Sequence, residues 1–168
     1  MIRFGCAALV LLSACNPEPG NDSGDVVDTA DPAACHSDHW WNGGNSESPL
    51  MHPGGDCITC HTDSREGPTF SVAGTVYTSQ NEPLDCDGLQ GVEVVITDSE
   101  GASISLTTNA AGNFYASPSQ YSPVMPITAV VRTADGERAM ATPQASGNCA
   151  SCHTADGTGG APGRVMAP

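Results

Sequence analysis

Cysteine is the residue type that most constrains this chain. The 168 residues include eight cysteines, more than an ordinary cytosolic domain carries, while aromatic residues make up only 5%. A core this poor in large apolar side chains suggests that something besides apolar burial helps to hold the fold. The way in which the eight cysteines divide among possible roles therefore decides what kind of protein this is.

Four cysteines fall into two copies of the pattern CxxCH, at residues 57–61 and 149–153. This pattern is typical of covalent c-type haem attachment, because two thiols on one turn can each form a thioether with a haem vinyl group. The adjacent histidine then places its imidazole on the iron. The sequence predicts two covalently bound haem c groups, held by Cys57, Cys60, Cys149 and Cys152, with His61 and His153 as proximal ligands.

Each motif follows a residue that is a good helix N-cap, Asp56 in the first case and Asn148 in the second. Each motif is therefore expected to begin a short helix. Three other uses of the cysteines stay open. A CxxC pair can be a redox dithiol, although the thioredoxin-like βαβ setting is missing here. The two groups together could hold zinc, and either pair could close a strained disulfide.

The ligand on the far side of each iron stays open. A neutral imidazole or a thioether can each serve, and a methionine would raise the potential. The candidates are His36, His39, His52, Met51, Met140 and Met166, each of which also has an ordinary explanation as a packing or loop residue. An open sixth position would favour small-ligand binding or peroxidase chemistry.

The N-terminal residues predict export. Arg3 precedes an apolar run that is too short to cross a bilayer as a helix and that fits a signal peptide. The run ends in Leu12-Ser13-Ala14-Cys15, which resembles the lipobox of bacterial lipoproteins. The resemblance implies cleavage after residue 14, loss of Cys6 and lipidation of Cys15. An ordinary signal peptide is the alternative.

The charge balance is strongly acidic, with 19 Asp and Glu against five Arg and a formal net charge of −14. This argues against nucleic acid as a partner and against charge-driven binding to an anionic membrane, whereas a lipid anchor tolerates it. The acids favour a redox partner protein with a basic patch, or they serve only solubility. The regularly spaced acids of residues 22–31 indicate a solvated linker rather than a calcium loop, because the EF-hand glycine and glutamate are missing.

Cys35 and Cys86 remain after these assignments. In an oxidising compartment, a disulfide between them is the simplest assignment. The alternative is a haem site at Cys35-His36 that lacks the first cysteine of the motif.

Residues 68–143 alternate between apolar and polar side chains in the manner of β-strands. The expected inner rows include Phe70, Val72, Gly74 and Val76, then Val92, Val94 and Ile96, then Ile104 and Leu106, and finally Ile127, Ala129 and Val131. Further short strands are expected at 113–115 and 137–142. About six short strands separated by turns predict a β-sandwich.

Three segments of this region carry a resemblance to a known family: Ala73-Gly74-Thr75-Val76, residues 89–94 (LQGVEV) and residues 108–114 (TNAAGNF). They resemble the carboxypeptidase regulatory-like, or transthyretin-like, domain. Asn109 stands where that family more often has aspartate, and an insert around residues 83–88 carries Cys86. The resemblance implies a seven-stranded Greek-key sandwich that serves as a stalk, spacer or binding module without catalysis.

The whole arrangement is also similar to dihaem lipoproteins of Gram-negative bacteria, on residues 51–54 (MHPG) and 160–164 (GAPGR). The predicted class is mainly β: a Greek-key sandwich flanked by two short helical or loop segments that bind haem. The expected organisation is a lipoprotein signal peptide (1–14), an acidic tether (15–47), a first haem-binding segment (48–67), the sandwich (68–143) and a second haem-binding segment (144–168).

The predicted function is electron transfer by an exported, lipid-anchored dihaem c-type cytochrome. Its predicted location is the cell envelope of a Gram-negative bacterium, in the periplasm or at the outer membrane or cell surface. No substrate-transforming site is evident. The alternatives are a non-redox surface or binding lipoprotein with zinc or disulfides at the CxxC pairs, and a haem peroxidase-like enzyme. If the ends of the sandwich lie close together, the two haems form one redox unit; if they lie at opposite poles, the two centres are independent.

Overall fold

A computed structural model describes residues 48–65 and 67–168. One α-helix lies in this part of the chain, α1 (Cys57–Ser64), together with seven strands. The strands are β1 (Val72–Tyr77), β2 (Glu93–Thr97), β3 (Ser103–Thr107), β4 (Asn113–Ala116), β5 (Thr128–Thr133), β6 (Gly136–Ala139) and β7 (Val165–Met166). No helix among the described residues is long and apolar enough to span a membrane.

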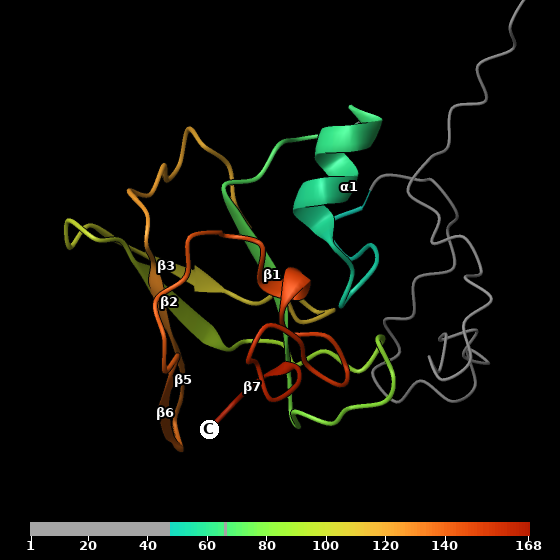
Figure 1. Ribbon diagram of the computed structural model, residues 1–168. Helices are drawn as coiled ribbons and strands as arrows, with labels where there is room; N and C mark the ends of the chain where they lie inside the picture. The colour runs from blue at the N-terminus through green and yellow to red at the C-terminus, as the bar shows by residue number, and fades with distance from the viewer. Residues whose placement is uncertain (1–47, 66) are drawn as a thin grey trace, which may run out of the picture.

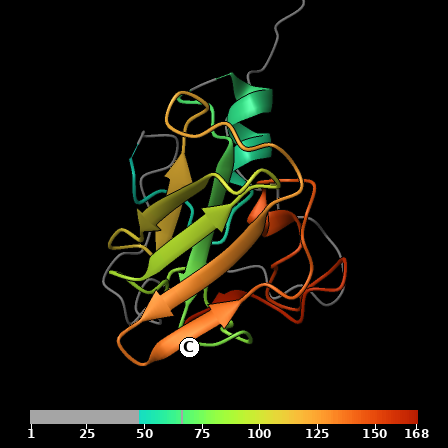
Figure 2. The same cartoon turned by 90° about the vertical axis from the view of Figure 1, so that its left-hand side faces the viewer.

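The strands form two sheets, one with the order β4-β1-β7 and one with the order β3-β2-β5-β6 (Figure 1). Strand β1 is antiparallel to β4 and parallel to β7, while all pairs in the second sheet are antiparallel. Figure 2 shows the four-stranded sheet from its outer side, with α1 behind it. The mainly β architecture predicted from alternation is confirmed, and six strands lie close to the predicted positions.

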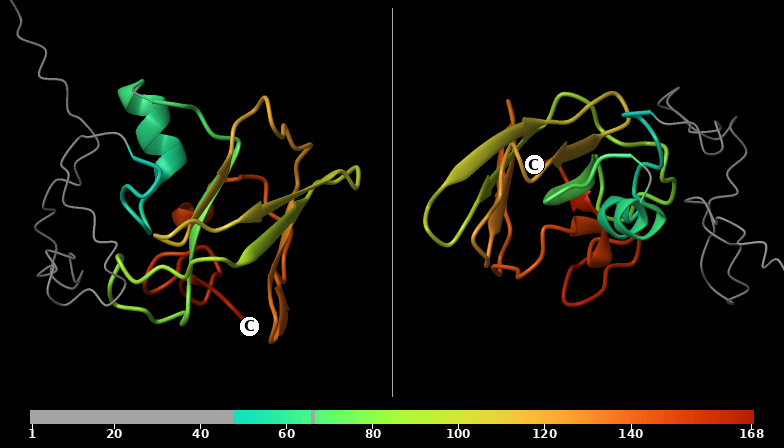
Figure 3. Two further views of the ribbon diagram at one scale, coloured as in Figure 1. Left: turned by 180° about the vertical axis from the view of Figure 1, so that it is seen from behind. Right: turned by 90° about the horizontal axis from the view of Figure 1, so that it is seen from above.

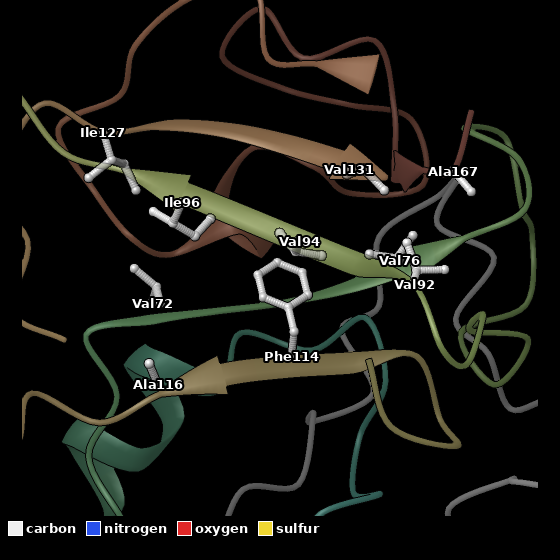
Figure 4. Close-up of a cluster of buried hydrophobic side chains, with 10 residues drawn as sticks. All are labelled: Val72, Val76, Val92, Val94, Ile96, Phe114, Ala116, Ile127, Val131 and Ala167. Atoms are coloured by element: carbon white, nitrogen blue, oxygen red, sulfur yellow. The ribbon is translucent and has the colours of Figure 1, made fainter. Parts of the chain in front are cut away.

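The hydrophobic core lies between the two sheets (Figure 4). Val72 and Val76 of β1 face Val94 and Ile96 of β2, and all four are nearly inaccessible to solvent. Phe114 of β4 fills the space between them. The alternating burial of β2 matches the predicted inner row, because successive side chains of a strand point to opposite faces of a sheet.

Strand β1 departs from the predicted alternation, since all six of its residues are buried. Ala73, Thr75 and Tyr77 point away from the inner face and are covered as well. The cover comes from the segments that flank the two CxxCH motifs. Gly54 N–H donates to Thr75 Oγ1 at 2.8 Å, for example. This outer face of the three-stranded sheet is therefore a second buried layer.

The C-terminal segment also contributes to the sandwich. Gly147 accepts a backbone hydrogen bond from Ala73 N–H at 3.0 Å, and β7 pairs with the end of β1 at Val76 and Tyr77. Strand β7 lies in the segment that was expected only to bind haem. The two-residue strand has too short an apolar pattern to be recognised before its partner strand is known.

Candidate haem-binding site

The first CxxCH motif forms most of α1. Asp56 is the N-cap, and its Oδ1 accepts a hydrogen bond from Thr59 N–H at 2.9 Å, as the sequence predicts. Residues spaced by three and four share one face of a helix. Cys57, Cys60 and His61 are accordingly half-buried on one side of α1, whereas Thr59, Thr62 and Asp63 are exposed.

The second motif forms only one turn of 3-10 helix, η2 (Cys149–Ser151), so the predicted helix is shorter than expected. The hydrogen bond from His153 N–H to the Cys149 carbonyl, at 2.9 Å, continues the turn to the histidine. Asn148 is at the N-cap position, but its side chain makes no capping bond. Its amide is used elsewhere, because Asn148 Nδ2 donates to Asp56 Oδ1 at 2.7 Å.

That hydrogen bond joins the starts of the two motifs, which are 92 residues apart in sequence. Asn148 Nδ2 also lies 3.5 Å from Thr59 Oγ1 in the first turn of α1. Both motifs lie beside β1, on the side of the molecule away from the four-stranded sheet (Figures 1 and 3). The ends of the sandwich therefore meet, and the two CxxCH motifs are neighbours rather than lying at opposite poles.

The imidazole of His153 is oriented by a backbone carbonyl. His153 Nδ1 lies 2.8 Å from the Gly163 oxygen. A carbonyl oxygen can only accept, so Nδ1 carries the proton and Nε2 keeps its lone pair. A histidine whose second nitrogen donates to a carbonyl in this way is prepared to bind a metal. His153 thus fits the role of a proximal iron ligand.

The imidazole of His61 is held by packing. Its ring meets Phe70 edge to face, with the centroids 4.9 Å apart. Gly67 lies against the other part of the ring: a Cβ added at Gly67 would be 2.9 Å from His61 Nδ1. Gly67 has a φ of 70°, which also favours glycine.

The first thiols of the two motifs, Cys57 and Cys149, are largely shielded from water. Cys149 packs against the hydrophobic core, and a Cβ added at Gly74 of β1 would lie 2.8 Å from Cys149 Cβ. Cys57 Sγ lies 3.4 Å from the Gly55 carbonyl oxygen. Burial raises the pKa of Cys57 to about 11 and the pKa of Cys149 to about 12. The negative charges of ionised Cys57 and Cys152 add to the rise in the pKa of Cys149, because both thiols lie close enough to disfavour its ionisation.

These shifts predict slow alkylation of both thiols in the folded protein without haem. Relative to the ordinary pKa of 9.0, the thiolate fraction at pH 7 falls about 100-fold for Cys57 and about 1,000-fold for Cys149. Iodoacetamide labelling at pH 7, followed by peptide mass spectrometry, should show this slowing relative to the same cysteines in urea. Equal rates in the folded and unfolded protein would contradict it.

Two other cysteines, Cys60 and Cys86, are disulfide-bonded. Cys57, Cys149 and Cys152 are free. A sulfur in a disulfide cannot form a thioether, so haem attachment at Cys60 first requires a reductant to supply two electrons and two protons. The Cys35–Cys86 pairing stays a prediction, because Cys35 lies outside the described residues.

The candidate distal ligands are dispersed. Met51 and His52 lie in the turn before α1, where the Met51 carbonyl accepts from Asn113 Nδ2 at 3.1 Å. His52 is half-buried with a φ of 42°, and burial lowers its pKa, which keeps the imidazole neutral. Met166 lies in β7, and Met140 bonds through its N–H to the Ala129 carbonyl of the four-stranded sheet.

His36, His39 and the predicted lipidation site Cys15 lie outside the described residues, as do the expected signal peptide and tether. Within the described residues, no group of three or more His, Cys, Asp or Glu side chains is placed to hold a metal ion. The donor set fits covalent haem at His153 and in the placement of Cys57, Cys60 and His61 on one side of α1, with Cys60 available once it is reduced.

Sequence reasoning missed a polar cluster that joins the two motifs. Arg164 is buried, with 5% of its surface exposed, and its Nη2 lies 2.5 Å from Asp85 Oδ1. The guanidinium also stacks over the Tyr77 ring, 4.5 Å from its centroid. The available signal was weak, since nothing in the sequence around Arg164 distinguishes a buried arginine from an exposed one.

Comparisons with known proteins leave the class open. No protein family, curated protein or solved structure matches this chain.

Proposed function

We propose that the protein is an exported dihaem c-type cytochrome that carries electrons. The observation that supports this most strongly is the meeting of the two CxxCH motifs, whose first residues are preceded by the hydrogen-bonded pair Asp56 and Asn148. Two distant copies of a haem-attachment pattern on one side of a sandwich are what a compact two-centre carrier requires. The proposal therefore includes a single redox unit rather than two independent centres.

Each residue of the motifs has a part in this proposal. Cys57 and Cys60 would hold one haem, and Cys149 and Cys152 the other. A bound haem supplies a one-electron couple at its iron. The chain contributes the proximal imidazoles of His61 and His153, of which His153 is held by Gly163 with Nε2 available. The distal ligand of each iron would come from the candidate histidines and methionines.

We further propose that the sandwich is a transthyretin-like, Greek-key domain that acts as the scaffold. The side chains of the TNAAGNF segment support this. Thr108 Oγ1 donates to the Leu89 carbonyl at 2.7 Å and accepts from Val92 N–H at 2.9 Å, which fastens the loop before β2. Asn109 Oδ1 accepts from backbone N–H groups of its own turn, and Gly112 has a φ of 77°.

The export features complete the proposal. Lipidation at Cys15 would anchor the protein in the envelope of a Gram-negative bacterium, in the periplasm or at the outer membrane. The acidic balance would favour a redox partner with a basic patch, through attraction that weakens with salt.

A second candidate is a non-redox surface or binding lipoprotein. The disulfide at Cys60 favours it, because that sulfur is already used in a structural bond. In that case the sandwich would be the functional part, and the CxxC groups would stabilise the segments that cover β1.

Haem content separates the two candidates. We expect the full chain, coexpressed with a haem-ligation system, to gain two haem-sized increments in intact mass after Cys60 is reduced. The absorption spectrum should show c-type haem in both oxidation states, and six-coordinate spectra in both would disfavour a peroxidase. No haem-sized increment under reducing conditions would exclude the cytochrome and leave the second candidate.

A further inference from the structure

The guanidinium of Arg164 is fixed on several sides. Besides the ion pair with Asp85, Arg164 Nε donates to the Glu82 carbonyl at 2.7 Å, and Nη1 donates to Tyr77 Oη at 3.3 Å. Among the described arginines only Arg164 is buried; Arg65, Arg132 and Arg138 are exposed. A buried charge is costly unless it is paired and hydrogen-bonded, so this side chain has a single well-defined position.

Backbone hydrogen bonds couple the position of Arg164 to the imidazole of His153. The N–H of Arg164 donates to the Gln80 carbonyl at 2.9 Å. The carbonyl of Gly163, which accepts from His153 Nδ1 at 2.8 Å, belongs to the same peptide group. Because a peptide group is planar, fixing its N–H also fixes the direction of its carbonyl. The orientation of the His153 imidazole therefore depends on the place of Arg164.

The same side chain touches the segment that leads into the first motif. A Cβ added at Gly54 would lie 2.8 Å from Arg164 Nη1 and 2.6 Å from Tyr77 Oη. Gly54 has a φ of 79°, and it lies three positions before Cys57, the first residue of α1. The turn before Cys57 thus packs directly against the Arg164–Tyr77 pair. At position 54 there is room for a glycine but not for a side chain.

We infer that Arg164 is a positioning residue that holds the His153 imidazole in the Nδ1–H form and seats the turn before the first motif on the same guanidinium. The role in redox chemistry rests on the proposed function, whereas the control of the imidazole is a property of the chain itself. A merely structural arginine would affect stability without selecting a tautomer.

The test uses the full chain with and without haem. In the chain without haem, ¹⁵N NMR of histidine at a pH where His153 is neutral should show Nδ1–H as the main tautomer. In Arg164→Gln, the ratio of Nδ1–H to Nε2–H at His153 should fall several-fold. The matched control is Arg132→Gln, which removes an exposed arginine paired with Glu93 and Glu137 and should leave the ratio unchanged.

A milder variant keeps the test decisive if Arg164→Gln does not fold. Tyr77→Phe removes one hydrogen bond to the guanidinium and leaves the ion pair with Asp85, and it should shift the ratio in the same direction by a smaller factor. A folded variant of either kind with the wild-type tautomer ratio would overturn the inference, as would a wild-type His153 that is mainly Nε2–H.

The haem-loaded chain supplies the second readout. In a background with Cys57→Ala and Cys60→Ala, which leaves the second motif alone, Tyr77→Phe should raise the reduction potential, because an imidazole whose Nδ1–H···O bond is weakened is a weaker donor to iron, and this substitution keeps the charge of Arg164. An unchanged potential would count against the inference. If no haem is attached, the proposed function fails, but the NMR result on the chain without haem still decides the role of Arg164.

Discussion

The chain with alanine at both Cys149 and Cys152 should carry one haem instead of two. Removing both thiols eliminates the only sulfurs that the second motif offers for thioether bonds. The first motif should keep its haem, because the Thr75 hydroxyl and the Asn113 amide, which lie outside the second motif, still hold its turn. Intact mass should fall by one haem-sized increment, and about half of the c-type absorbance should be lost.

The reciprocal variant, with alanine at Cys57 and Cys60, is the matched control and should also retain one haem. Comparing the two variants tests the idea of a single redox unit. When two centres lie close together, the charge state of one iron alters the potential of the other. The potentials of the single-haem variants should therefore differ from those of the two-haem protein. Identical potentials would contradict the single unit, and two haems in either variant would contradict the assignment of the cysteines.

The second large effect is expected at Gly74. In Gly74→Val, the new side chain would begin 2.8 Å from both Cys149 Cβ and Phe114 Cζ, closer than carbon atoms can approach. The Cys149 atom is next to the backbone of η2 and the Phe114 ring is part of the core, so neither can move without displacing a segment. Overpacking of this kind costs about 2–3 kcal/mol. Urea unfolding should show this loss, and the variant should incorporate less haem at the second motif than the wild type.

Gly91→Ala is the matched control for Gly74→Val. Gly91 has a φ of 79° and no atom within 4 Å of the position of an added Cβ. Its substitution should cost about 1–2 kcal/mol through backbone strain alone. It should leave haem incorporation at both motifs unchanged. If both variants lost haem to the same extent, general destabilisation would explain the effect. The idea that Gly74 is needed to leave room for Cys149 would then be wrong.

The alternating sequence was enough to predict most of the sandwich. Rows such as Val92, Val94 and Ile96 have a period of two residues, and burial of one face follows from that period. The prediction was less accurate for β1, where Thr75 and Tyr77 looked like exposed positions. Their burial depends on segments far away in the chain, and no local sequence pattern predicts that distant segments will cover a strand.

The candidate site likewise has a part that the sequence predicts and a part that it does not. The sequence determined the chemistry-bearing residues, because two thiols and a histidine must lie on one turn for their side chains to act together, and that is a local property. Only the tertiary structure decided that Asp56 and Asn148 meet, that Gly163 orients His153 and that a buried Arg164 joins the two segments. These contacts span 10 to 92 residues. They exist because the two ends of the sandwich lie against the same strand, a consequence of packing that spacing along the chain does not encode.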